Sequence, residues 1–152
     1  MTLTRRHFLT TTMAFTAVSF LAGHALADTS SIYAEDGVAL GGTDVVAYFT
    51  QGQPVAGSAE ITQEWQGVTW RFASADNKAA FAADPSRYAP QYGRYCAYAV
   101  SEGYTASTTP EAWRIVDDKL YLNYSIGVQQ RWAQDIPGRI AAADANWPSL
   151  RE

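Results

Sequence analysis

The stretch that decides the fold is residues 59–73, which read AEITQEWQGVTWRFA. Gln66-Gly67, near its centre, is a two-residue turn of the kind that joins antiparallel strands. After this turn, Trp70 and Phe72 alternate with polar residues, and such alternation indicates a strand with one buried face. The stretch therefore predicts a β-hairpin whose two strands are Ala59–Trp65 and Val68–Ala73.

A second hairpin is predicted further along the chain. Its strands, Ala112–Val116 and Leu120–Tyr124, flank the polar turn Asp117-Asp118-Lys119. We detect no internal repeat in the sequence. The patterns together predict an α+β fold, with a small antiparallel sheet of about four strands in two hairpins packed with short helices.

Helix-capping residues mark where the helices are expected. Asp44, Ser74 and Ser125 are residue types that cap helix N-termini, and each precedes a segment with apolar positions at helical spacing. The expected segments are a helical turn over Val45–Phe49, a helix from Ser74 to Asp84-Pro85, a turn over Pro85–Gln91, a helix from Ser125 through Asp135, and a last helix from Pro137 to about Ala145 followed by Trp147-Pro148.

Residues 92–101 are the segment of greatest chemical interest. As a helix they would place Tyr92, Cys96 and Val100 on one face, whereas as a strand Cys96 would share a face with Arg94. We prefer the helix. If it begins near residue 93, Cys96 lies in its first turn, where the helix dipole and the nearby Arg94 favour a thiolate.

The N-terminal segment has the form of an export signal. Thr4-Arg5-Arg6-His7-Phe8-Leu9 contains twin arginines, a weakly apolar stretch follows, and Ala25-Leu26-Ala27 has the small-x-small pattern of a cleavage site. We predict export by the twin-arginine translocase to the periplasm, with cleavage after Ala27. The expected division is a signal peptide at 1–27, a flexible leader at 28–36, a domain at 37–148 and a tail at 149–152.

Cleavage would leave few residues with strong chemistry. Both histidines, His7 and His24, would be lost, and Cys96 would be the one cysteine of the mature chain. The loss of two arginines would lower the net charge from −4 to −6, and an acidic domain repels nucleic acid and anionic membranes. No apolar stretch reaches the roughly 20 residues that span a bilayer. We therefore expect neither nucleic-acid binding nor stable membrane insertion.

Several segments together resemble the YHS domain, in its branch of stand-alone exported proteins that includes selenoproteins. The resemblance covers residues 37–148, nearly all of the expected mature chain. The matching segments are Gly41-Gly42-x-Asp44-Val45-Val46-Ala47-Tyr48-Phe49, Trp70-x-Phe72-Ala73-Ser74-x-x-Asn77-x-x-x-Phe81, Asp84-Pro85-x-x-Tyr88-x-Pro90-x-Tyr92-Gly93-x-Tyr95-Cys96-Ala97, Ala112-Trp113-x-Ile115-Val116-Asp117, Leu120-Tyr121-Leu122-Asn123 and Ala143-Asp144-x-Asn146-Trp147-Pro148.

The resemblance implies a small domain associated with metal sensing, metal transport or hydroxylases. Metal-binding relatives carry paired cysteines where this chain has Ala73 and Asn77, so the best-known ligands of the family are missing. Cys96 is the position that would correspond to selenocysteine. Thr43 and Arg94 depart from the pattern, which has Tyr and Gly at these positions.

Cys96 is the strongest single candidate for a functional residue. It could act as a redox thiol or as a ligand of a transition-metal ion, with Tyr92, Tyr95 and Arg94 nearby in sequence. Asp44, Asn77, Glu102 and the tyrosine hydroxyls are the other available donors, although one thiolate with oxygen donors is an unusual ligand set. The alternative is that Cys96 is a small apolar filler of the core, as free cysteines usually are.

Two function classes follow from these residues. The first is an exported binding or accessory module whose working residue is Cys96. The second is an aromatic-lined domain for a small ligand or a protein partner, in which Cys96 is inert. Trp70, Trp113 and Tyr121 could present such an aromatic surface, although a role in the core is the simpler interpretation. An enzyme is the least favoured class, because no nucleophile–base or other catalytic motif is present.

Overall fold

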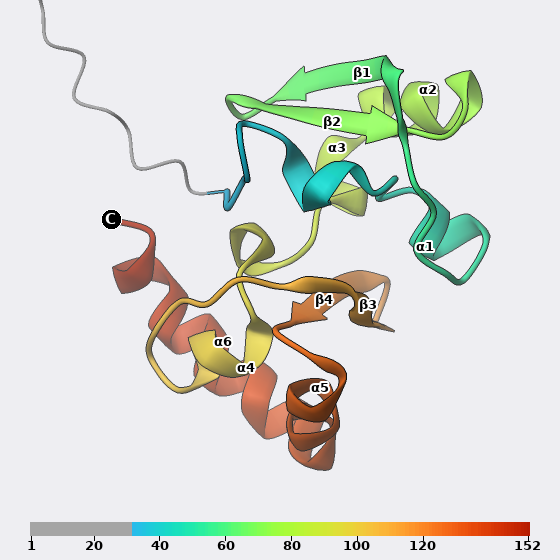
Figure 1. The fold of residues 1–152 in the computed structure, drawn as a ribbon. Coiled ribbons are helices and arrows are strands. Elements are labelled where there is room, and N and C mark those ends of the chain that lie inside the picture. Colours follow the sequence, from blue (N-terminus) through green and yellow to red (C-terminus); the bar gives the residue numbers. More distant parts are fainter. Residues whose placement is uncertain (1–31) are drawn as a thin grey trace, which may run out of the picture.

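A computed structural model describes residues 32–152, so the predicted signal peptide and most of the leader lie outside the described residues. The described chain divides into two units stacked one above the other (Figure 1). The first unit contains 3₁₀ turn η1 (Ala39–Gly42), α1 (Ala47–Thr50), β1 (Ser58–Trp65), β2 (Val68–Phe72), α2 (Ala75–Ala83) and α3 (Pro85–Tyr88). The second contains η2 (Tyr92–Arg94), α4 (Ala97–Ser101), β3 (Thr109–Val116), β4 (Lys119–Asn123), α5 (Ile126–Trp132), η3 (Ala133–Asp135) and α6 (Ile136–Leu150).

Two antiparallel hairpins form the β structure, which confirms the predicted α+β fold with four strands. β1 pairs with β2, and β3 pairs with β4, as two separate two-stranded sheets. Ser74 and Ser125 cap the following helices as predicted, because their hydroxyl groups accept the N–H groups of Asn77 and Val128. In both hairpins, a serine-capped helix therefore begins the same number of residues after the second strand.

The second unit repeats the first, which the sequence did not reveal. Every residue pair of the β1–β2 hairpin has a counterpart 51 residues later in β3–β4. The Ser58–Phe72 pair, for example, corresponds to the Thr109–Asn123 pair. The irregularity in each hairpin also falls at the same place. The prediction of no internal repeat is therefore wrong at the level of structure.

The stacked rings behind the hairpins follow the same 51-residue spacing. Trp70 packs against Phe81 with ring centroids 4.9 Å apart, and Tyr121 packs against Trp132 at 5.4 Å. Asp84 and Asp135 each cap a following helix by accepting the N–H group three residues ahead. Both units thus use one design: a hairpin, a serine-capped helix, and a helix capped by aspartate.

The turns before the hairpins match with a spacing of 52 residues. Leu40, Gly41 and Gly42 have φ values of 55°, 58° and 88°. Their counterparts Tyr92, Gly93 and Arg94 have values of 56°, 56° and 71°. Left-handed backbone at Tyr92 and Arg94 ends any regular helix there, so the predicted helix over residues 92–101 is wrong in its first half, and only α4 is helical.

The final helix is longer than predicted. α6 continues through Trp147 and Pro148 to Leu150, where an end near Ala145 had been expected. Within residues 32–152, no helix combines the length and the apolarity needed to cross a membrane. Ile32, in the part of the predicted leader that the structure describes, is buried, and the N–H group of Tyr33 donates to the carbonyl of Gly93.

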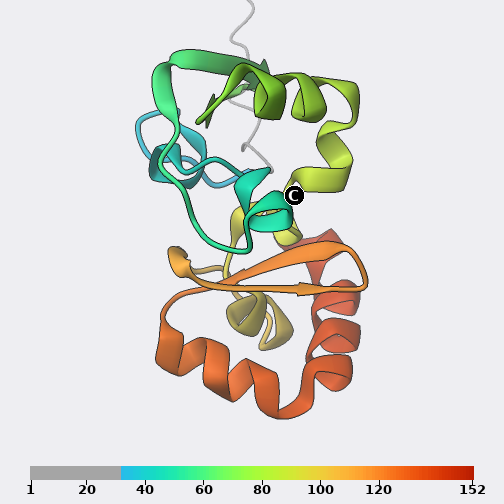
Figure 2. The same cartoon turned by 90° about the vertical axis from the view of Figure 1, so that its right-hand side faces the viewer.

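β4 lies between the two hydrophobic cores. Leu120 and Leu122 belong to the core of the first unit, whereas Tyr121 belongs to the core of the second. The alternation follows from the two-residue period of a strand. Figure 2 shows the β3–β4 hairpin between the first unit and the helices of the second.

Candidate functional site

Asp44 precedes α1 and is fully buried, but the N-cap position of α1 is Val46, so Asp44 is not the N-cap residue that the sequence predicts. Its Oδ1 accepts the N–H of Val46 at 2.9 Å, and its Oδ2 accepts the N–H of Ala73 at 2.8 Å and the side-chain amide of Asn77 at 2.7 Å. The carboxylate thus fastens α1 to the end of β2 and to α2. The structure brings the predicted residues Asp44 and Asn77 together, and it places neither beside Cys96.

Cys96 takes the place of Asp44 in the second unit. The backbone N–H groups of Asp44 and Cys96 donate to carbonyl oxygens of Val55 and Ala106, which match with the 51-residue spacing. The Sγ atom of Cys96 accepts the N–H of Tyr124 at 3.2 Å, as Asp44 accepts that of Ala73. Cys96 is therefore the residue before α4, not a member of its first turn as predicted.

Asn123 supplies the capping oxygen that Cys96 lacks. Its Oδ1 accepts the N–H of Tyr98 at 3.1 Å and lies 3.7 Å from Sγ of Cys96. The thiol has an exposed fraction of 1%. It forms part of the floor of a surface depression of about 260 Å³, here called the Cys96 depression, whose other walls include Tyr104, Tyr124 and Arg131.

The other residues predicted around Cys96 point elsewhere. The hydroxyl of Tyr92 donates to Asp144 at 2.8 Å, and the ring of Tyr95 packs against Tyr33 and Trp147. Arg94 lines two cavities to which Cys96 does not contribute. The cluster of Cys96, Tyr92, Tyr95 and Arg94 expected from sequence proximity therefore does not form one site.

Metal binding at Cys96 has little support in the donors present. Among residues 32–152, no group of three or more His, Cys, Asp or Glu side chains could hold a metal ion. Asp44 and Asn77 are occupied with each other in the first unit. The residues around the thiol therefore do not fit a soft-metal centre.

Arg94 has the most unusual environment of any charged residue in the described part of the chain. Its exposed fraction is only 3%, and burial lowers its pKa to about 10. The Nε and Nη1 atoms are buried and have no hydrogen-bond partner among residues 32–152. The guanidinium lies over the ring of Tyr33, with Cζ 5.4 Å from the ring centroid.

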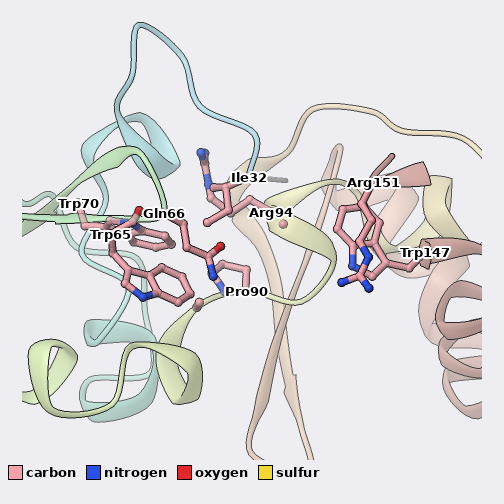
Figure 3. A pocket seen from close by; sticks show the side chains of 10 residues that line it. Ile32, Trp65, Gln66, Trp70, Pro90, Arg94, Trp147 and Arg151 are labelled. Atoms are coloured by element: carbon pink, nitrogen blue, oxygen red, sulfur yellow. The ribbon is translucent and has the colours of Figure 1, made fainter. Parts of the chain in front are cut away.

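Arg94 lines a cavity of about 170 Å³ where the two units meet, here called the junction cavity. Figure 3 shows Trp65, Gln66 and Trp70 on one side and Trp147 and Arg151 on the other. Ile32, Ala89, Pro90, Gly93 and Arg94 complete the lining. Arg94 also lines a smaller cavity of about 70 Å³ beside Tyr33, Glu35 and Thr108.

The aromatic side chains do not form the surface that the sequence suggested. Trp70 and Trp113 belong to the first core and Tyr121 to the second, so the interpretation as core residues holds for these three. Trp65, Trp147 and Arg151 are the cavity residues that sequence reasoning missed. They come from a hairpin turn and from the far end of the chain, and no spacing in the sequence links them.

The chain matches no protein-family model, no curated protein and no solved structure.

Proposed function

We propose that this protein is an exported binding module whose site for a small ligand is the junction cavity. The observation that carries the proposal is the cavity itself, which joins three tryptophans and two arginines contributed by both units. Ligand sites are typically concave, largely apolar and furnished with a few polar groups that orient the ligand. The junction cavity is concave and combines tryptophan side chains, which can contact the body of a ligand, with Arg94, Arg151 and Gln66, which can donate hydrogen bonds to it.

Binding is tested with a panel of small carboxylates and their matched amides and amines. Because Trp65, Trp70 and Trp147 line the cavity, a bound ligand is expected to change tryptophan fluorescence. Native mass spectrometry of protein purified from the periplasm checks for a ligand that is retained during purification. Binding of at least one compound, with saturation, supports the proposal.

A pair of filling variants assigns binding to the cavity. Ala89→Phe places a ring in the junction cavity, whereas Ala142→Phe places one in a separate hollow between α5 and α6. Loss of binding in the first variant with retention in the second is expected. Equal binding by both variants, or no binding by any compound, would remove the junction cavity as the functional site.

Thiol chemistry at Cys96 is the second candidate function. It is supported by the place of Cys96 among the residues that line a surface depression and by the hydrogen bond that its Sγ atom accepts from the N–H group of Tyr124. The low exposure of the thiol weighs against it. Rates of thiol labelling, described in the Discussion, test this candidate.

The resemblance to the YHS domain and the twin-arginine motif complete the proposal. We propose that the chain folds before export, loses residues 1–27 and works in the periplasm as a stand-alone module of this type. Fractionation of cells with the Arg5-Arg6 pair intact or replaced by Lys-Lys tests this step. Retention of the Lys-Lys form in the cytoplasm is expected, and export of both forms would contradict the twin-arginine assignment.

A further inference from the structure

We propose that Arg94 selects the ligand of the junction cavity and that this ligand is a small carboxylate with an apolar body. The inference rests on the proposed function and adds the chemical class of the ligand. It follows from the absence of a counterion at a buried guanidinium.

Two of the three guanidinium nitrogens of Arg94 have no hydrogen-bond acceptor among residues 32–152. Nε and Nη1 are buried without partners, and the one ion pair in this part of the chain joins Arg139 to Glu102. Glu35, the carboxylate that interacts with Arg94 over a distance, is exposed and accepts the hydroxyl of Tyr33. The ring of Tyr33 faces the guanidinium but supplies no negative charge, and a buried cation without a counterion is unfavourable, so this site gains most from an anion supplied from outside.

The charges around the cavity also favour an anion. Arg151 is a second cation in the lining, and no Asp or Glu side chain belongs to it. The chain as a whole has a net charge of −4, so this cavity is a positive site in an acidic protein. Clefts lined by one sign of charge concentrate ligands of the opposite sign.

The walls and the volume of the cavity define the rest of the ligand. Trp65, Trp147, Ile32 and Pro90 offer apolar surface, and about 170 Å³ lies below the roughly 300–1,000 Å³ of drug-sized sites. The planar guanidinium fits a carboxylate in one plane.

The first test measures the ligand-free protein. Arg94→Met removes the unpaired charge and keeps a long apolar side chain, and it is expected to raise the midpoint of thermal unfolding by about 2–4 °C. Arg114→Met removes an exposed arginine and controls for the change in net charge. A lower midpoint for Arg94→Met than for Arg114→Met would make Arg94 a structural residue and overturn the inference.

The second test compares benzoate with benzamide, which has the same shape and no charge. Benzoate is expected to raise the unfolding midpoint of the wild-type protein and of Arg114→Met, but not of Arg94→Met, and benzamide is expected to leave all three unchanged. Equal effects of both compounds, blocked by Ala89→Phe, would overturn selection by Arg94 while the binding function stands. No binding by any compound of the panel would overturn both proposals.

Discussion

Asp44 and Cys96 accept hydrogen bonds from backbone N–H groups at equivalent positions of two repeated units. Oδ2 of Asp44 lies 2.8 Å from the N atom of Ala73, and Sγ of Cys96 lies 3.2 Å from the N atom of Tyr124. Asn77 completes the first arrangement by donating to Asp44. Its counterpart 51 residues later is Val128, which lines the Cys96 depression instead. The same position of the fold thus holds a fully hydrogen-bonded carboxylate in one unit and a cysteine that lines the Cys96 depression in the other.

The Asp44 network predicts a large loss of stability on truncation. Asp44→Ala leaves three donors without their acceptor, two of them backbone N–H groups, and is expected to cost about 3 kcal/mol or more of the free energy of unfolding. Asp84→Ala, which removes an exposed helix cap, is expected to cost about 1 kcal/mol. Urea unfolding measures both values. Similar costs for the two variants would show that the buried network contributes little.

The equivalence of the two units can be tested by rebuilding the first pair in the second unit. Cys96→Asp alone buries a carboxylate without the Asn77 amide and is expected to destabilise the protein. Adding Val128→Asn supplies that amide, so the double variant is expected to recover at least about 1 kcal/mol relative to the sum of the single changes. A double-mutant cycle from urea unfolding gives this coupling energy. A value near zero would contradict the structural equivalence of the two positions.

The burial of Cys96 predicts slow reaction with thiol reagents. With 1% of its surface exposed, the thiol is expected to react with a small maleimide about 100-fold more slowly in the native protein than in the urea-unfolded chain. Stopped-flow labelling at several pH values measures the ratio. A native rate equal to or above the unfolded rate, with an acidic midpoint, would instead support thiol chemistry as the function.

Gly57 and Gly127 are expected to respond to alanine in opposite directions. A Cβ atom at Gly57 would lie 2.5 Å from the backbone carbon of Arg71, so Gly57→Ala is expected to cost about 3 kcal/mol. At Gly127 in α5 the nearest atom would be 3.9 Å away, and Gly127→Ala is expected to gain about 0.5 kcal/mol from helix propensity. Thermal unfolding of both variants measures the signs, and a tolerated Gly57→Ala would contradict the close approach to β2.

Buried tyrosines predict a loss of stability at alkaline pH. Burial raises the pKa of Tyr48, Tyr92 and Tyr121, so above pH of about 10 the unfolded chain loses these protons before the folded chain does. Folding stability is therefore fully present below that pH and falls above it. The lowered pKa of Arg94 acts in the opposite direction, but it is one group against three.

Absorbance of tyrosinate during an alkaline titration measures this effect. The buried rings of Tyr48, Tyr92 and Tyr121 are expected to ionise only as the protein unfolds. Tyr92→Phe removes one hydroxyl group with a raised pKa. The free energy of unfolding of this variant is expected to fall less steeply with alkaline pH. A single titration step with no loss of structure would contradict the burial of these hydroxyl groups.

Local patterns in the sequence were sufficient for the hairpins and the serine caps, because a strand period and a cap each depend on neighbouring residues. They failed over residues 92–101, where Tyr92 and Arg94 adopt left-handed backbone without being residue types that favour it. The repeat is hard to detect in the sequence because equivalent core positions carry different residues in the two units, one ring being smaller and its stacking partner larger. Trp70 corresponds to Tyr121 and Phe81 to Trp132, and both stacked pairs persist.

The candidate site could not be assembled from the sequence for a different reason. The closeness of Arg94 and Cys96 in the chain predicts that they act together, but in the structure they line different hollows. Trp65 and Trp147 meet across the junction only because the two units stack in three dimensions. Proximity of this kind depends on tertiary packing, which no local pattern encodes.

The position of β4 has a consequence for how the molecule melts. In a chain built from two similar units, the simplest expectation is that the units unfold one after the other. Here a single strand supplies Leu120 and Leu122 to one interior and Tyr121 to the other, so neither half can open without exposing part of its neighbour. Calorimetry should therefore record one cooperative transition for the whole of residues 32–152.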